Sequence, residues 1–168
     1  MKARIRKIRR RLRFTRAQRF ARNERGTQLA ELAIVLPILL MLFATTAEFG
    51  RFFYQYTTLA KATRAATRYL VTAGVNSTED TRAKNILVYG NAEGTGAPVL
   101  SNLTTGNVTI TRTGGAPSVP QVVTVQITGY KFQPFFDLAS LTNTPSLSLK
   151  VDVQPSVTMR YLLTTPLI

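Results

Sequence analysis

The chain has 168 residues and a net charge of +14, from 22 basic and 8 acidic side chains. It contains no cysteine and no histidine, which excludes disulfides, metal sites centred on His or Cys, and catalysis by Ser-His-Asp or Cys-His groups. This length allows one domain and a helical appendage.

The positive charge is concentrated at the N-terminus. Residues 1–25 carry 12 of the 22 basic side chains and one acid, Glu24. Three interpretations compete: a nucleic-acid-binding arm, a transit peptide, and the cytoplasmic flank of a membrane helix. The apolar segment that follows at once favours the third, and the positive-inside rule then places the N-terminus in the cytoplasm. We therefore expect no nucleic-acid partner.

The next stretch, residues 27–49, is an apolar segment. Its uncharged run, residues 32–47, would be about 24 Å long as a helix, whereas the hydrocarbon core of a membrane is about 30 Å thick. Counted over residues 27–50, the helix would reach about 36 Å and could cross. We expect the transmembrane segment to cover residues 29–49.

Three residues within this segment stand out. Glu31 and Glu48 fall near the two membrane interfaces, where a carboxylate can reach water. Pro37 removes a backbone hydrogen bond and predicts a kink in the helix. For Glu48 we expect an ion pair with Arg51 on the helix surface, because a spacing of three residues brings two helical side chains together.

Helical periodicity continues beyond the membrane segment. Apolar residues recur at spacings of three and four as far as Leu70, which predicts one continuous helix over residues 27–73 with Gly74 as its C-cap. The opposite, wetter face of this helix carries three basic residues, Lys61, Arg64 and Arg68. The aromatic cluster of residues 49–56 is interpreted as an interfacial belt, with a ligand site as the alternative.

The last part of the chain, residues 74–168, predicts a small α/β domain. A helix is expected over residues 77–89, with a cap at Ser77 and a stop at Gly90. Apolar and polar residues then alternate as in antiparallel strands with one covered face, around residues 108–112, 123–128, 147–153 and 157–161, with a break or bulge at Pro155. The fold class is therefore α+β: a long helix, transmembrane and then amphipathic, packed on a small antiparallel sheet.

A loop between the expected strands, residues 131–138, holds three phenylalanines and a leucine. These side chains could form a patch that binds a partner. Alternatively, they cap the open end of the core.

The N-terminal region resembles a class III signal peptide, because a basic leader ends at Gly26 and Glu31 follows at the head of an apolar helix. It resembles type IV prepilins, and more closely the TadE-like (TadE/TadF) family of minor pseudopilins from tight-adherence (Tad or Flp) pilus systems. The resemblance covers residues 25–70 and rests on Arg25-Gly26, Glu31-Leu32-Ala33, Leu36-Pro37, Glu48-Phe49-Gly50-Arg51 and the Ala/Arg-rich stretch from Ala60 to Arg68.

This resemblance implies a pilin-like protein that matures by cleavage. A prepilin peptidase would cut between Gly26 and Thr27 and remove residues 1–26 as the leader. Thr27 stands where many type IV pilins have Phe, which leaves N-methylation open. Glu31 would serve in peptidase recognition and assembly, by pairing with the new terminal amine of its own or a neighbouring subunit. Glu48, Gly50 and Arg51 would be family-motif residues.

The implied partners are the peptidase, other pilin or pseudopilin subunits, the inner-membrane pilus platform and membrane lipid. The resemblance implies no enzymatic activity and no cofactor. The chain would divide into the leader 1–26, a long helix 27–73 and an extracytoplasmic domain 74–168, in a single-pass protein of the bacterial inner membrane.

Two other interpretations stay open at this point. The first is an uncut single-pass membrane protein whose outer domain binds a partner. The second is a domain released by ordinary signal peptidase after Thr45-Thr46-Ala47, which is disfavoured because the helical pattern continues past Ala47.

Overall fold

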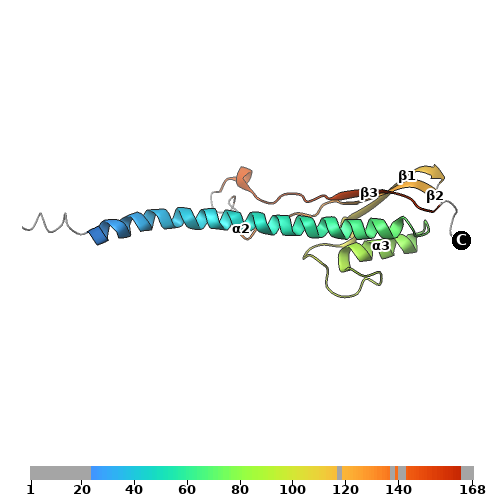
Figure 1. The fold of residues 1–168 in the computed structure, drawn as a ribbon, viewed down its shortest axis with the longest axis horizontal. Helices are drawn as coiled ribbons and strands as arrows, with labels where there is room; N and C mark the ends of the chain where they lie inside the picture. Colours follow the sequence, from blue (N-terminus) through green and yellow to red (C-terminus); the bar gives the residue numbers. More distant parts are fainter. Residues whose placement is uncertain (1–23, 117–118, 137–138, 140–142, 164–168) are drawn as a thin grey trace, which may run out of the picture. The chain divides into compact units, whose positions relative to one another are not determined.

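The computed structural model describes residues 24–116, 119–136, 139 and 143–163. Its main elements are helix α2 (Glu24–Leu70), helix α3 (Ser77–Tyr89) and strands β1 (Val108–Ala116), β2 (Val119–Ile127) and β3 (Ser156–Arg160) (Figure 1). This is the predicted α+β arrangement of a long apolar helix and a small antiparallel sheet. The chain forms two compact units, Met1–Thr46 and Ala47–Ile168. Most of the predicted leader, residues 1–23, and Leu138 lie outside the described residues.

In the first unit, the described residues form the N-terminal part of α2. Large apolar side chains are exposed on every side of it, from Leu29 at 67 % to Phe43 at 72 %. By length and composition this helix could cross a membrane, and its most apolar window is not buried in the protein. Lipid would cover such a surface, whereas a helix of a soluble protein buries its apolar stripe. Pro37 lies inside α2, which continues on both sides of it, so the predicted kink stays a prediction.

In the second unit α2 is amphipathic, as its periodicity predicts. One face is completely buried and consists of Leu59, Thr63, Ala66, Thr67 and Leu70. The two threonine hydroxyls donate hydrogen bonds to helix carbonyls one turn earlier, at 2.8 and 2.7 Å, so both buried hydroxyls are paired. The other face exposes the predicted basic residues Lys61, Arg64 and Arg68. The helix ends at Leu70, a few residues before the predicted end at Gly74.

Helix α3 has a cap at each end. The Asn76 side chain accepts a hydrogen bond from the amide of Glu79 at 2.8 Å, and Gly90 closes the helix with a positive φ of 77°. The predicted stop at Gly90 is confirmed. The predicted cap at Ser77 is wrong by one residue, because the extended backbone of Asn76 directs its carboxamide oxygen at the first turn.

The three strands form one antiparallel sheet in the order β1-β2-β3. Their register sets Ile110 opposite Val125 and Val125 opposite Val157, so apolar residues share one face. On that face, β2 is fully buried at Val123, Val125 and Ile127. The opposite face is polar, and there the hydroxyls of Thr124 and Thr158 lie 2.9 Å apart across two strands. This alternation confirms the period of two expected for these strands.

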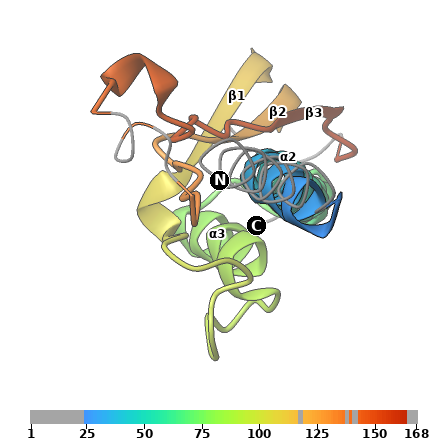
Figure 2. The same cartoon turned by 90° about the vertical axis from the view of Figure 1, so that its left-hand side faces the viewer.

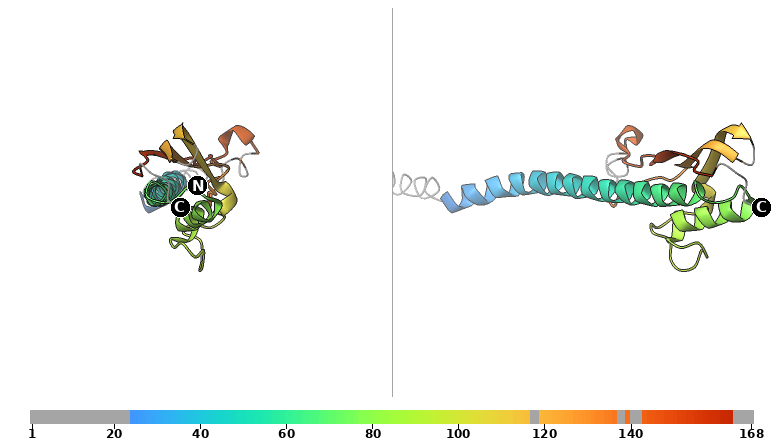
Figure 3. Two further views of the ribbon diagram at one scale, coloured as in Figure 1. Left: turned by 90° about the vertical axis from the view of Figure 1, so that its right-hand side faces the viewer. Right: turned by 45° about the vertical axis from the view of Figure 1, so that its right-hand side comes forward.

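The second unit has one hydrophobic core. Seen along α2, helices α2 and α3 lie side by side against one face of the sheet, as both end-on views show (Figures 2 and 3). Leu87 and Val88 of α3 join the buried faces of α2 and β2 in this core. Arg112 of β1 forms a bidentate ion pair with Asp80, which fixes α3 against the sheet. Tyr161 donates to the carbonyl of Ala73, which joins the end of β3 to the turn after α2.

The strand expected over residues 147–153 is not formed. Instead, a 3₁₀ turn covers Pro145–Leu147, and a single bridge joins Lys131 to Asp152. Two backbone hydrogen bonds of 2.9 Å support this bridge, from Phe132 to Val151 and from Val153 to Tyr130. The segment after β2 joins residues 147–153 at this bridge alone, so no ladder forms. The predicted break at Pro155 is present, because β3 begins at the next residue.

Two buried tyrosines make the stability of this core sensitive to alkali. Burial raises the pKa of Tyr130 above the ordinary 10.0, and it also raises the pKa of Tyr161, where the positive charge of Arg112 opposes the rise. The folded chain therefore holds these phenol protons more tightly than the unfolded chain. Their contribution is fully present below the ordinary pKa and is lost as pH rises through the raised values.

We expect the free energy of unfolding of the detergent-solubilised chain to fall between about pH 9 and about pH 11, as tyrosines ionise. Tyr130→Phe should make this fall shallower, because it removes one of the tyrosines whose pKa is raised in the folded chain. Tyr54→Phe is the control, since Tyr54 is 66 % exposed. Urea unfolding followed by circular dichroism at several pH values measures the effect. If the Tyr130→Phe profile has the wild-type slope, the link between Tyr130 burial and alkaline stability is wrong.

Candidate functional site

The residues predicted for leader cleavage lie in the first turns of α2. Gly26 and Thr27 are already helical, because α2 begins at Glu24, and both are exposed. A Cβ atom at Gly26 would meet nothing within 4 Å. Glu31 is also exposed, one helical turn further along. The uncut chain is therefore helical at the expected cleavage site.

The alternative signal-peptidase site is also helical. The hydroxyls of Thr45 and Thr46 donate to the carbonyls of Met41 and Leu42, both at 2.9 Å, as in an uninterrupted helix. A protease would have to unwind this part of α2 before cutting after Ala47.

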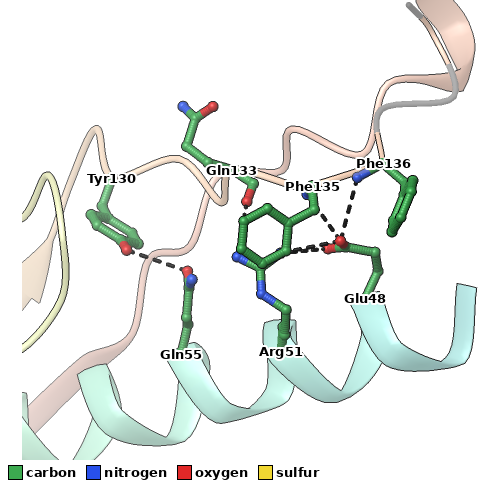
Figure 4. A network of polar contacts seen from close by, with 7 residues as sticks. All are labelled: Glu48, Arg51, Gln55, Tyr130, Gln133, Phe135 and Phe136. Carbon is green, nitrogen blue, oxygen red and sulfur yellow. Dashed lines mark hydrogen bonds and ion pairs between the residues drawn. The ribbon is translucent and has the colours of Figure 1, made fainter. Parts of the chain in front are cut away.

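The densest group of polar contacts is built on Glu48, where the second unit begins. Glu48 is 5 % exposed, although a glutamate is rarely buried unless it is paired. Arg51, one turn later on α2, contacts it through an ion pair of 3.0 Å. The backbone amides of Phe135 and Phe136 donate to Glu48 Oε1 at 2.9 and 3.4 Å (Figure 4). Glu48 therefore joins α2 to a loop more than eighty residues away in the sequence.

Arg51 contacts the same loop through its other side. Its guanidinium lies 3.6 Å from the ring centroid of Phe135 and 5.6 Å from that of Phe132. It also donates to the carbonyl of Gln133 at 3.5 Å (Figure 4). A cation over an aromatic face gains from the ring quadrupole, and more so where water is excluded. The arginine thus neutralises Glu48 and holds the loop.

The aromatic residues of this loop have two different environments. Phe132 is buried at 2 % and packs edge-on against Phe52 of α2, with ring centroids 5.5 Å apart. Phe135 and Phe136 are 76 % and 55 % exposed. One phenylalanine thus completes the core, as the second interpretation expects. The other two are exposed, and a partner-binding role for them stays a prediction.

A second contact holds the loop one turn further along α2. The hydroxyl of Tyr130 donates to Gln55 Oε1 at 3.3 Å (Figure 4). Gly50, in contrast, makes no such contact, and a Cβ atom there would meet nothing within 4 Å. Contacts within this chain thus explain the presence of Glu48 and Arg51 in the motif, whereas they do not explain Gly50.

The sequence predicts part of this site. The ion pair between Glu48 and Arg51 follows from their spacing and is present, but its predicted place on the helix surface is wrong, because the loop covers it. The loop amides carry no sequence signal of their own. The one available hint was the phenylalanine-rich stretch after Lys131, since apolar residues in a loop require a surface to rest on.

Chemically, the site is suited to holding structure. The carboxylate is neutralised and fully hydrogen-bonded, so it is poorly placed to act as a base. Within the residues that the structure describes, no three Asp or Glu side chains gather to hold a metal ion.

A double-mutant cycle of Glu48→Ala and Arg51→Ala should give a coupling energy of about 1–2 kcal/mol, because the pair is largely covered by the loop. The matched control is Glu79 and Arg82, which have the same spacing and the same 3.0 Å separation, but with a 52 % exposed arginine side chain. That coupling should be smaller. Urea unfolding of each variant supplies the free energies. Equal couplings for the two pairs would contradict the assigned role of the loop.

One comparison with known proteins gives a match. A family model described as TadE-like protein matches residues 26–68, which lie within α2. No curated protein and no solved structure matches the chain. The matched segment begins at Gly26 and contains Glu31, Pro37 and the Glu48–Arg51 pair. Over this segment of helix α2, the chain is similar to TadE-like proteins.

Proposed function

We propose that the protein is a minor pilin or pseudopilin of a Tad pilus, cut by a prepilin peptidase and active in pilus assembly. The TadE-like match indicates association with a Tad pilus, and the exposed apolar part of α2 indicates a membrane anchor. The observation that carries the proposal is that the family match begins at Gly26, the residue before the proposed cut. The basic leader, which ends at that point, is outside the matched segment.

The charge distribution supports one orientation. With residues 1–25 in the cytoplasm, α2 crosses the inner membrane and the second unit lies on the periplasmic or extracellular side. Cleavage after Gly26 removes most of the net positive charge, which would otherwise resist withdrawal of the helix from the membrane. The mature subunit could then pass from the membrane into a filament.

The proposed cut lies in the first turns of a helix. A peptidase needs an extended substrate, so these turns must unwind before the bond between Gly26 and Thr27 is cut. Glycine favours this step, because it is about 1 kcal/mol less favourable than alanine inside a helix.

Glu31 is proposed to act in assembly. It is exposed on α2 and separated from Thr27 by about one helical turn, roughly 6 Å along the axis. After cleavage, the new amine of Thr27 is a cation that can pair with this carboxylate in the same or a neighbouring subunit. An unpaired carboxylate in an apolar layer costs about 3 kcal/mol, so such a pair would set the axial register between subunits. The proposed partners are the peptidase, other pilin subunits and the inner-membrane platform.

Gly26→Val should abolish cleavage when the chain is co-expressed with its cognate prepilin peptidase. The side chain fits in the uncut chain, so the block would arise at the peptidase. The control is Gly50→Val, at a second glycine of α2 with equally open space, which should be processed normally. Intact mass and N-terminal sequencing report the product, with Thr27 expected as the first residue.

An uncut wild-type chain beside an active peptidase would overturn the cleavage proposal. It would favour the alternative of an unprocessed single-pass membrane protein with a partner-binding outer domain. A product that begins at Glu48 would favour release by ordinary signal peptidase.

Glu31→Ala should leave membrane insertion unchanged and reduce pilus assembly at least about tenfold, because a lost ion pair in an apolar layer is worth more than 1.4 kcal/mol. Gln28→Ala, one turn earlier on the same exposed helix, is the control. Flotation of membranes measures insertion, and the amount of sheared surface pili measures assembly. Normal piliation by the Glu31→Ala strain would show that the pairing role is wrong.

A further inference from the structure

The loop formed by residues 131–136 presents an apolar surface that no described residue of the second unit covers. Phe135 and Phe136 are 76 % and 55 % exposed at its end. Both are held there by backbone hydrogen bonds to a buried carboxylate and, for Phe135, by the stacked guanidinium of Arg51. These three contacts hold the two rings in water although their hydration is unfavourable, which indicates that another surface covers them.

The position of the loop along α2 indicates which surface covers the two phenylalanine rings. Glu48, to which the loop amides bind, directly follows the uncharged run of residues 32–47. The two rings are therefore fixed at the level where the apolar run ends. At this level Phe49 and Phe53 of α2 are also exposed, at 57 % and 61 %. Aromatic rings gather at this depth in membrane proteins, because they combine an apolar body with tolerance of the headgroup region.

The length of the uncharged run leads to the same surface. At about 24 Å it is shorter than the hydrocarbon core of about 30 Å, so apolar lipid extends beyond one or both of its ends. The first charge met at the C-terminal end is that of Glu48, and it is buried, paired with Arg51 and bonded to two amides. The loop thus buries the Glu48 carboxylate, which would otherwise oppose contact with lipid at this level.

We propose that residues 131–136 form a second membrane contact, in which Phe135 and Phe136 enter the boundary between headgroups and acyl chains on the outer side. The occupant of the exposed patch is the lipid surface itself. This inference rests on the proposed membrane anchoring of α2 and adds an interaction of the folded domain with the membrane. A loop of this kind penetrates about 5–10 Å, as interfacial apolar segments do.

Tryptophan fluorescence can test this contact, because the chain has no tryptophan of its own. The full-length Phe135→Trp chain is reconstituted into phosphatidylcholine–phosphatidylglycerol liposomes, with lipids brominated near the top of the acyl chains as quenchers. The control is Leu162→Trp, at another exposed apolar residue, 66 % exposed. The amide of Leu162 binds the carbonyl of Val71, beyond the far end of α2 and about 30 Å along the helix from Glu48.

We expect the Phe135→Trp emission to be blue-shifted, quenched by the brominated lipid and protected from aqueous acrylamide about two- to threefold relative to Leu162→Trp. Adding Glu48→Ala should reduce the bromine quenching, because the loop is released. If that double variant unfolds, Phe136→Trp in the otherwise native chain is a second test of the contact. Its fluorescence should also be quenched by the brominated lipid.

Each contrary result has a distinct meaning. Equal acrylamide access in the Phe135→Trp and Leu162→Trp chains would overturn the lipid contact. The emission could instead be blue-shifted without bromine quenching, with a shift that disappears when the protein is diluted in lipid. That result would assign the patch to a second copy of the chain and would also overturn the lipid contact. Failure of the chain to float with the liposomes would overturn the membrane anchor itself.

Discussion

The structure of the second unit depends on burying one carboxylate. Glu48 stands where the apolar stretch of α2 gives way to the folded domain, and left alone there it would have to be hydrated. Arg51 supplies the counter-charge and the amides of Phe135 and Phe136 supply the remaining donors. These bonds can form only if the segment after β2 runs back along α2. The path of the loop is thus a consequence of satisfying this one side chain.

The rest of the second unit follows more ordinary rules. Its core is the buried stripe of α2, the apolar face of α3 and one face of a three-stranded sheet. The bidentate pair of Arg112 and Asp80 and the bond from Tyr161 to Ala73 join these layers at their edges. With no cysteine in the chain, such contacts and the core take the place that disulfides have in many secreted domains.

The sequence was informative wherever a single period dominates. Apolar residues recur about every 3.6 residues in helices and every two residues in strands. This periodicity predicts the long helix, the capped helix at residues 77–89 and the strands of the β1–β2 hairpin. The same alternation misled at residues 147–153, where a strand lacks a partner long enough to pair with. Half of the Glu48 site was predictable from the spacing to Arg51. The other half comes from backbone amides, whose position depends on the tertiary path and on no residue type.

The contacts around Glu48 also have a mechanical consequence. Because the loop is bonded to Glu48, Arg51 and Gln55 over two successive turns, it cannot slide or rotate against this part of α2 without breaking several bonds at once. A pull along the helix is therefore transmitted to the sheet side of the domain near the start of the second unit, as well as at the far end where Tyr161 is joined to Ala73. A force applied to α2 is therefore shared among the Glu48 contacts, the core and the bond from Tyr161 to Ala73.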